Sequence, residues 1–232
     1  MVIKGILFDK DGTLFDYQAT WTPVNRKAAI AAASGNVAVS ERLLAIGGHD
    51  PATDEVTAGS LLAAGNTSEI AMLWAAELPH RRVGELVELL DRIFQNEGIV
   101  SAVPVTDLGA FFTRLRTLDL CLGVATNDSQ VAAELTLERF DLRQLLDFIA
   151  GYDSGFGVKP GPGMVEAFCR TTNLKPEEVM VVGDNTHDMQ MGEAAGVGRL
   201  IGVLTGTSSR GVLSSHAHHV LGSIDDIFDI LE

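Results

Sequence analysis

The chain has few cysteines, few positive charges and no long apolar segment. Its two cysteines, Cys121 and Cys169, lie in apolar stretches, which excludes a disulfide framework and predicts buried thiols in a reducing compartment. Lysine and arginine number 17 against 31 acidic residues, a formal net charge of −14. A chain of this charge is unsuited to nucleic acid or an anionic membrane as a partner.

No apolar run reaches the roughly 18 residues that a membrane-spanning helix needs. The chain opens directly on a strand pattern, so we expect no signal peptide and a cytoplasmic location. With 46% apolar and 21% charged residues among 232, the composition is typical of a folded protein with one large core or two unequal domains.

The first fourteen residues are the most informative stretch. An apolar run with β-branched residues predicts a buried strand that ends at Asp9-Lys10-Asp11-Gly12. In extended backbone Asp9 and Asp11 share one side, whereas Lys10 turns away, so we expect Lys10 to have little effect. Two crowded acids favour a divalent cation with oxygen ligands. Alone, this motif is also consistent with a solvated acidic turn.

The next stretch is rich in Ala, Leu and Glu, with apolar residues at helical spacing. The pattern predicts helices over residues 21–33, 67–77 and 83–95, with a loop at Gly47–Pro51. No strand pattern occurs in this region. We therefore expect a helical insertion after the first strand.

From Thr106 onward, strand and helix patterns alternate, which predicts a parallel sheet with right-handed crossovers. The expected strands are residues 120–126, 147–150, 179–182, 200–204 and 219–221. The expected helices are residues 108–118, 130–139, 164–172, the segment from Asp188 to Ala195 and a closing helix from Ile224.

Polar side chains stand where three of these strands end. Asp9 and Asp11 follow the first strand, Thr126 and Asn127 follow another, and Asp184 and Asp188 follow a third. Ligands of open α/β sheets bind outside the carboxyl ends of the strands, and the loop that carries Lys159 can fold over the same edge. Carboxylates in oxygen-only company fit Mg²⁺. No Cys/His spacing suggests zinc.

These segments together resemble the four motifs of the haloacid dehalogenase superfamily: Asp9-Lys10-Asp11-Gly12-Thr13, Thr126-Asn127, Lys159-Pro160, and Gly183-Asp184 with Asp188. Lys159-Pro160-Gly161-Pro162 and the helical insertion resemble the phosphoglycolate phosphatase-like branch. The resemblance implies an α/β fold with a Rossmann-like parallel-sheet core over residues 1–18 and 98–232. It also implies an inserted α-helical cap domain over residues 19–97, with hinges near 15–20 and 98–105.

The resemblance also implies roles. Asp9 would attack phosphorus and form an aspartyl-phosphate, and Asp11 would act as general acid and then general base. Asp9, Asp184 and the backbone carbonyl of Asp11 would hold Mg²⁺, with Asp188 as a ligand or as support for the ligands. Thr126 and Lys159 would bind phosphate oxygens, joined by Asn127 and the backbone of Lys10, and Lys159 would also restrain the carboxylates.

The expected function is Mg²⁺-dependent hydrolysis of a small soluble phosphomonoester such as phosphoglycolate, by a monomer or homodimer. A phosphosugar mutase of the β-phosphoglucomutase type shares the motifs and the helical cap, and a non-catalytic phosphate-binding regulatory protein is the alternative of another class. Asp11 argues against dehalogenation. Phosphonate hydrolysis needs a cap lysine, and Lys27 is the single lysine between residues 11 and 158.

Other residues leave two interpretations open. Trp21 either walls the site or packs in a core, and His187 either touches substrate or does not. The positive groups of the insertion either meet a substrate carboxylate or belong to solvated helix faces. They are Arg26, Arg42, His49, His80, Arg81 and Arg82.

Overall fold

The computed structural model describes residues 2–231, and a parallel sheet lies at its centre. Its strand order is β5-β4-β1-β6-β7-β8, and every neighbouring pair is parallel. The strands are β1 (Gly5–Phe8), β4 (Cys121–Ala125), β5 (Phe148–Ala150), β6 (Val179–Gly183), β7 (Arg199–Val203) and β8 (His219–Leu221). The predicted α/β parallel sheet is confirmed.

Helices cover both faces of the sheet because both faces of its strands are apolar. In β1, Ile6 and Phe8 join one buried cluster and Leu7 joins another on the opposite face. The first cluster includes residues of α6 (Leu108–Arg116), α7 (Gln130–Arg139) and the 3₁₀ helix η3 (Ile224–Ile230). The second includes residues of α8 (Gly163–Thr172), α9 (Thr186–Ala195) and α10 (Arg210–Leu213). Two shorter 3₁₀ helices are η1 (Arg143–Leu145) and η2 (Pro176–Glu178).

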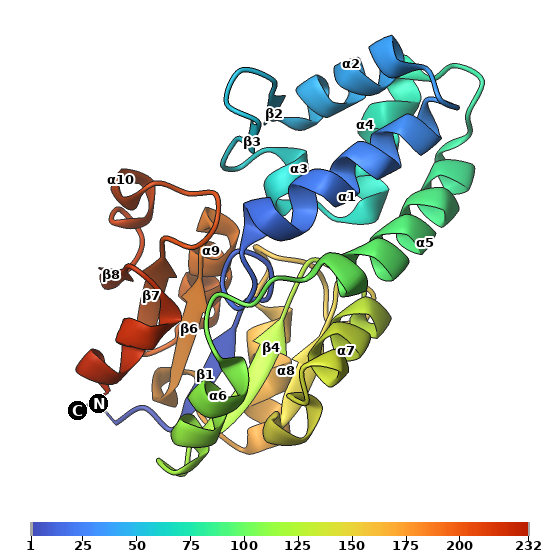
Figure 1. Ribbon diagram of the computed structural model, residues 1–232. Coiled ribbons are helices and arrows are strands. Elements are labelled where there is room, and N and C mark those ends of the chain that lie inside the picture. The colour runs from blue at the N-terminus through green and yellow to red at the C-terminus, as the bar shows by residue number, and fades with distance from the viewer. Residues whose placement is uncertain (1, 232) are drawn as a thin grey trace.

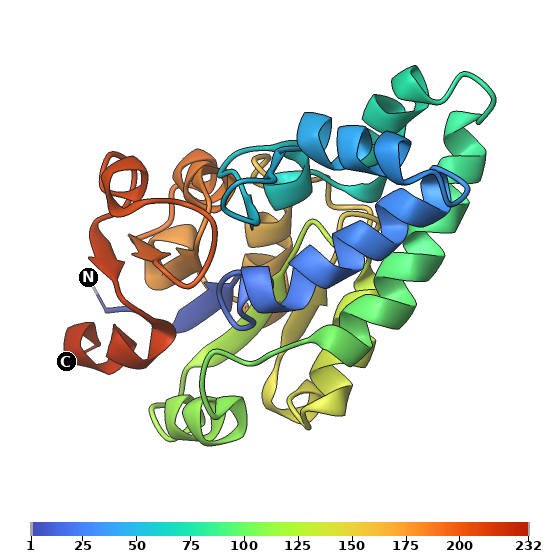
Figure 2. The same cartoon turned by 45° about the horizontal axis from the view of Figure 1, so that its top comes forward.

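A separate helical layer lies over one end of the sheet (Figures 1 and 2). It contains α1 (Tyr17–Ala32), α2 (Val37–Gly47), α3 (Leu61–Ala64), α4 (Thr67–Glu77), α5 (Val83–Ser101) and the short hairpin of β2 (His49–Asp50) and β3 (Glu55–Val56). Its buried cluster centres on Trp74, Leu43 and Leu90, and it shares no residue with the two clusters of the sheet. The layer therefore has an apolar core of its own.

The two chain segments that join the layers are hydrogen-bonded to each other. The backbone N–H of Asp16 donates to the carbonyl oxygen of Val103 at 2.9 Å, and the N–H of Val103 donates to the Thr20 hydroxyl at 3.1 Å. The N–H of Val105 donates to the carbonyl oxygen of Leu14 at 3.1 Å. The segment that leads into the helical layer and the segment that leads out of it therefore lie side by side, joined by hydrogen bonds.

Several boundaries differ from the sequence predictions. The expectation of no strand in the insertion is wrong, because β2 and β3 pair; two residues each are too few to produce an alternating pattern. Helix α2 was not predicted. Helix α1 starts at Tyr17 instead of residue 21, because the Asp16 side chain accepts the Ala19 N–H at 2.8 Å and caps the helix there. Helix α5 runs on to Ser101 instead of ending at residue 95.

Within residues 2–231, no helix is both long enough and apolar enough to cross a bilayer.

Candidate active site

The three central strands bring the predicted site residues to one edge of the sheet. Asp9 follows β1, Thr126 follows β4, and Asp184 follows β6, and β1 is paired with both of the other strands. Lys159 reaches the same edge from the loop between β5 and α8. A pocket between this edge and the helical layer is lined by Asp9, Asp11, Thr126, Asn127, Lys159 and Asp188 from the sheet side. Asp184 is buried and is not among the residues that line the pocket.

Three buried carboxylates meet at this edge of the sheet. One oxygen from each of Asp9, Asp184 and Asp188 lies within 4.8 Å of the others. The Lys159 ammonium donates to Asp9 Oδ1 and to Asp188 Oδ1, both at 2.6 Å. Burial raises the pKa of Asp9 to about 7 although Lys159 opposes the shift. Burial, with Asp9 and Asp188 adding to it, holds the pKa of Asp184 well above its usual value.

These acids fit a divalent cation. Among the described residues 2–231, Asp9 Oδ2 is buried and accepts no hydrogen bond, so the donors around the cluster do not satisfy all of its oxygens. All the donors are carboxylate oxygens, which Mg²⁺ prefers. The side chain of Asp11 is not in this cluster.

A loop after β7 holds Asp184 in place. The backbone N–H of Thr207 donates to Asp184 Oδ2 at 2.9 Å, and the Thr205 hydroxyl donates to the Gly12 carbonyl oxygen at 2.7 Å. A Cβ at Gly206 would lie 1.9 Å from Asp184 Oδ2. Sequence reasoning missed this loop, although Thr205-Gly206-Thr207 is a fourth polar segment at the end of a predicted strand.

We expect Gly206→Ala to weaken Mg²⁺ binding by roughly 10- to 100-fold, the usual effect of disturbing the support of a metal ligand. The added methyl group must displace the Asp184 carboxylate. Isothermal titration with MgCl₂ measures the change. Gly211→Ala, four residues beyond Thr207, is the control, since its Cβ would meet nothing closer than 4.0 Å. Equal Mg²⁺ affinity in both variants would contradict this account.

Thr126 and Asn127 are held in different ways. The buried Thr126 hydroxyl accepts the Asp128 N–H at 3.0 Å. Asn127 Oδ1 accepts the Lys159 backbone N–H at 3.1 Å, and its amide donates to the carbonyl oxygen of Ala64 at 2.9 Å. Ala64 is the last residue of α3. The Asn127 side chain therefore joins the lysine loop to the helical layer.

Lys10 is not among the residues that line the pocket, as alternation predicts, but its side chain is paired with Asp11. Its ammonium lies 2.7 Å from Asp11 Oδ2 and 3.2 Å from Asp128 Oδ2, and the side chain is 3% exposed. Alternation does not predict these ion pairs, because β1 ends at Phe8 and the chain turns immediately afterwards. Burial opposes charge on Lys10, but Asp11 and Asp128 together raise its pKa above the usual value.

The pattern of the haloacid dehalogenase-like hydrolase family matches residues 3–196. This chain is a haloacid dehalogenase-like hydrolase. It is 26% identical over 197 residues to the N-acetylmuramic acid 6-phosphate phosphatase of Pseudomonas putida, covering 84% of this chain and 81% of the relative. It is 28% identical over 216 residues to the phosphoglycolate phosphatase of Salmonella typhimurium, covering 84% and 79%.

Solved structures share the fold. The hydrolase superposes on a candidate phosphoglycolate phosphatase from Haemophilus somnus 129pt with a TM-score of 0.75, at 19% identity and covering 99% and 98% of the two chains. A candidate β-phosphoglucomutase from Thermotoga maritima gives a TM-score of 0.67, also at 19% identity and covering 99% and 98%. The predicted superfamily is confirmed, and the fold alone is common to phosphatase and mutase.

The helical layer closes the pocket of the hydrolase with neutral side chains. Trp21, Asn25, Ile70 and Phe94 line it from this side. The sequence left open whether Trp21 walls the site or packs in a core, and it does both. Besides lining the pocket, it packs edge to face on Phe94, with ring centroids 5.5 Å apart. Among the described residues, Trp21 Nε1 and Asn25 Nδ2 are buried donors without a partner. A polar substrate group would satisfy them.

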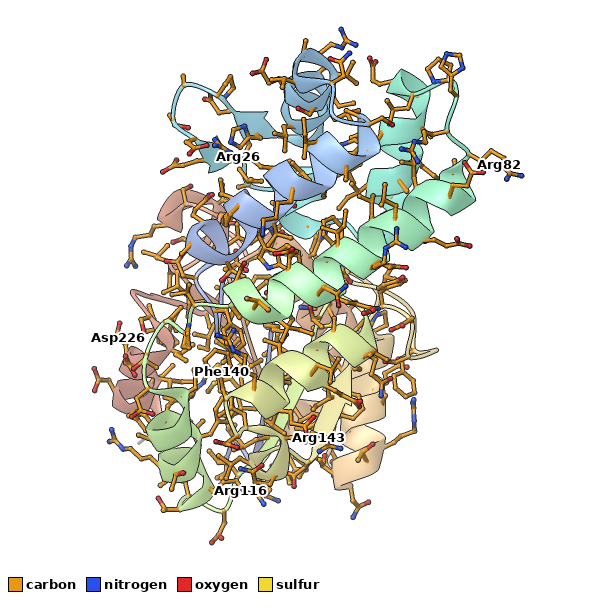
Figure 3. All side chains as sticks on the ribbon, turned by 45° about the vertical axis from the view of Figure 1, so that its right-hand side comes forward. Arg26, Arg82, Arg116, Phe140, Arg143 and Asp226 are labelled. Carbon is orange, nitrogen blue, oxygen red and sulfur yellow. The ribbon has the colours of Figure 1, made fainter. Side chains whose placement is uncertain are left out.

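His187 lines the pocket from the sheet side, and its Nδ1 has no partner among residues 2–231. The six positive groups of the insertion are not among the pocket-lining residues. Arg26 pairs with Asp54, and Arg82 pairs with Glu85. Figure 3 shows Arg82 pointing away from the molecule, at the loop between α4 and α5. The solvated-face interpretation holds for these arginines.

Proposed function

We propose that this hydrolase is a Mg²⁺-dependent phosphatase that cleaves a small phosphomonoester through an aspartyl-phosphate on Asp9. One observation carries the proposal. Asp9 lines the pocket, and among residues 2–231 its buried Oδ2 has no hydrogen-bond partner, while its other oxygen is fixed by Lys159 at 2.6 Å. A carboxylate held by one oxygen and free at the other is oriented for attack on phosphorus.

Two displacements complete the reaction. Asp9 Oδ2 bonds to phosphorus, the bond from phosphorus to the substrate alcohol breaks, and the leaving oxygen keeps the electron pair and takes a proton from the Asp11 carboxyl. Asp11, now a carboxylate, removes a proton from water, whose oxygen attacks the phosphorus. The bond to Asp9 breaks, inorganic phosphate leaves, and both aspartates return to their starting states.

Asp9, Asp184 and the backbone carbonyl of Asp11 would hold Mg²⁺, with Asp188 as a further ligand or as support. When bound there, the ion would shield the attacking carboxylate from the negative charge of the phosphate. Lys159 and the Thr126 hydroxyl would bind the remaining phosphate oxygens and stabilise the transferring group. Asn127 is bonded to the Lys159 backbone and to Ala64, so we assign it to positioning the lysine loop as well as to phosphate contact.

We propose the core and cap boundaries already expected, residues 1–18 with 98–232 and residues 19–97. Cap opening about the paired connection near Asp16 and Val103 would admit substrate, and closure would exclude bulk water. The space between the layers suits a small alcohol such as glycolate or a hydroxylated carbon chain. The relatives are named for substrates of two kinds, a hydroxy acid phosphate and a sugar phosphate.

The test is phosphate release from a panel of phosphorylated metabolites, with and without Mg²⁺. The panel contains phosphoglycolate, glycerol phosphate, sugar phosphates and p-nitrophenyl phosphate. We expect Mg²⁺-dependent hydrolysis of at least one member, and loss of activity on EDTA treatment that excess MgCl₂ restores. Faster isomerisation than hydrolysis of a sugar phosphate would establish the mutase instead. Phosphate binding without turnover of any member would establish the non-catalytic alternative.

We expect the Asn25 side chain to bind the part of the substrate that departs as the alcohol. We expect Asn25→Leu, which removes the amide but keeps its size, to lower kcat/KM by roughly 10-fold for the best hydroxylated substrate, equivalent to about 1.4 kcal/mol and within the range for one buried hydrogen bond. The kcat/KM for p-nitrophenyl phosphate should hardly change. Asn96→Leu, an exposed position on α5, is the control. An equal loss with both substrates would contradict this role.

A further inference from the structure

Lys10 is the one buried lysine besides Lys159 among the described residues. Its ammonium is within reach of both oxygens of Asp11, at 2.9 Å from Oδ1 and 2.7 Å from Oδ2. It also lies 3.2 Å from Asp128 Oδ2 and 5.6 Å from the centre of the Trp21 ring. One side chain therefore contacts the first motif, the loop after β4 and the helical layer.

Asp128, the second acid that contacts Lys10, is itself held in place by hydrogen bonds. Asp128 Oδ1 accepts the Ser129 N–H at 2.8 Å, and the Asp128 N–H donates to the Thr126 hydroxyl at 3.0 Å. Ser129 is the N-cap of α7. Asp128 is thus fixed from its backbone and from one carboxylate oxygen, which leaves the other oxygen to hold Lys10.

We propose that Lys10 is a positioning residue that fixes the Asp11 carboxylate on the leaving-group side of the pocket. The inference rests on the proposed function, in which Asp11 transfers the proton. Asp11 lines the pocket, whereas Lys10 does not, so the lysine lies behind the acid and can orient it without touching substrate. Contact with both oxygens restrains rotation of the carboxyl group. Asp128 in turn restrains the lysine.

The contact with Trp21 connects this arrangement to the helical layer. Trp21 is on α1, and its ring covers the Lys10 ammonium, an attractive contact that excludes water. The surroundings of the Lys10 ammonium are therefore complete, with Trp21 in place, when the helical layer lies over the sheet. Proton transfer would then be aligned in the same state that encloses the substrate.

The experiment uses Lys10→Met and two substrates that differ in their need for a proton. An alkyl phosphate needs the acid when its alcohol leaves, whereas 2,4-dinitrophenolate leaves unaided. The ratio kcat/KM covers the steps up to departure of the alcohol. General acid catalysis typically contributes about 10²–10⁴, so we expect a loss of about 10- to 100-fold for the alkyl phosphate and less than about 3-fold for the dinitrophenyl ester.

The second step gives an independent readout. Because activation of water also needs Asp11, the variant should release dinitrophenolate in a burst of about one equivalent per enzyme and then turn over slowly. Equal losses with both substrates, or no burst, would overturn the positioning role. If the wild-type enzyme itself forms no phosphoenzyme with this ester, the proposed function fails, whatever Lys10 does.

A double variant separates positioning from folding. Lys10→Met leaves the carboxylates of Asp11 and Asp128 without their shared cation, and adding Asp128→Asn removes the excess charge. We expect the double variant to recover much of the Tm of the wild type but to keep the alkyl-phosphate defect. Recovery of both would show a purely structural role. Lys4→Met, on a lysine that is 56% exposed and paired with Glu178, is the matched control.

Discussion

Asp9→Asn should reduce phosphate release by roughly 10⁴- to 10⁶-fold, the loss expected when a covalent nucleophile is removed. The amide keeps the shape of the side chain but is a poor nucleophile. It also loses the charge that pairs with Lys159 at 2.6 Å. Steady-state phosphate release measures the loss, and intact-mass analysis of acid-quenched enzyme should show a phosphoryl adduct in the wild type and none in the variant.

The matched control is Asp119→Asn, the same chemical change on an exposed turn before β4. Asp119 has a φ of 55°, a conformation that asparagine tolerates well. The control should therefore keep wild-type activity and stability. Full turnover by the Asp9 variant would end the aspartyl-phosphate mechanism.

Lys159→Met should destabilise the metal-free protein by about 3–5 kcal/mol, because removing one partner of a buried ion pair leaves uncompensated charge. Asp9, Asp184 and Asp188 would then share the pocket without their cation. A divalent ion can supply the missing positive charge. MgCl₂ should therefore raise the Tm of the variant more than that of the wild type, as thermal unfolding with and without Mg²⁺ would measure.

Mg²⁺ should restore the stability of the Lys159 variant but not its activity. Removing one stabilising donor from a transition state typically costs about 10²–10³ in kcat, so kcat should stay low at saturating MgCl₂. Lys175→Met, at an exposed lysine before η2, is the control. Recovery of kcat with Mg²⁺ would assign Lys159 to charge balance alone.

The sheet and the position of the site could be predicted because both follow from local patterns. Buried parallel strands are apolar throughout, and their carboxyl ends share one edge, so Asp9, Asp184 and Lys159 could be placed together without coordinates. Two helices were located well, and side-chain caps mark where both begin. Helix α4 (Thr67–Glu77) and helix α7 (Gln130–Arg139) have the predicted limits.

Contacts between segments distant in the sequence could not be predicted in this way. The position of Lys10 depends on a turn that ends the strand period, and on Asp128 from another strand end. The hydrogen bond from Asn127 to Ala64 depends on where α3 lies over the sheet. The positions of the buried donors Trp21 Nε1 and Asn25 Nδ2 depend on how α1 packs. Neither spacing nor periodicity carries this information.

The separate apolar core of the helical layer has an evolutionary consequence. Side chains such as Trp21 and Phe94 belong to that core and also face the pocket, whereas the carboxylates are carried by the sheet. Mutations that remodel the layer can therefore change which alcohol is accepted while the bond-breaking groups remain in place. Such an architecture lets gene duplicates diverge in substrate, and so in metabolic role, while they retain the same catalytic groups.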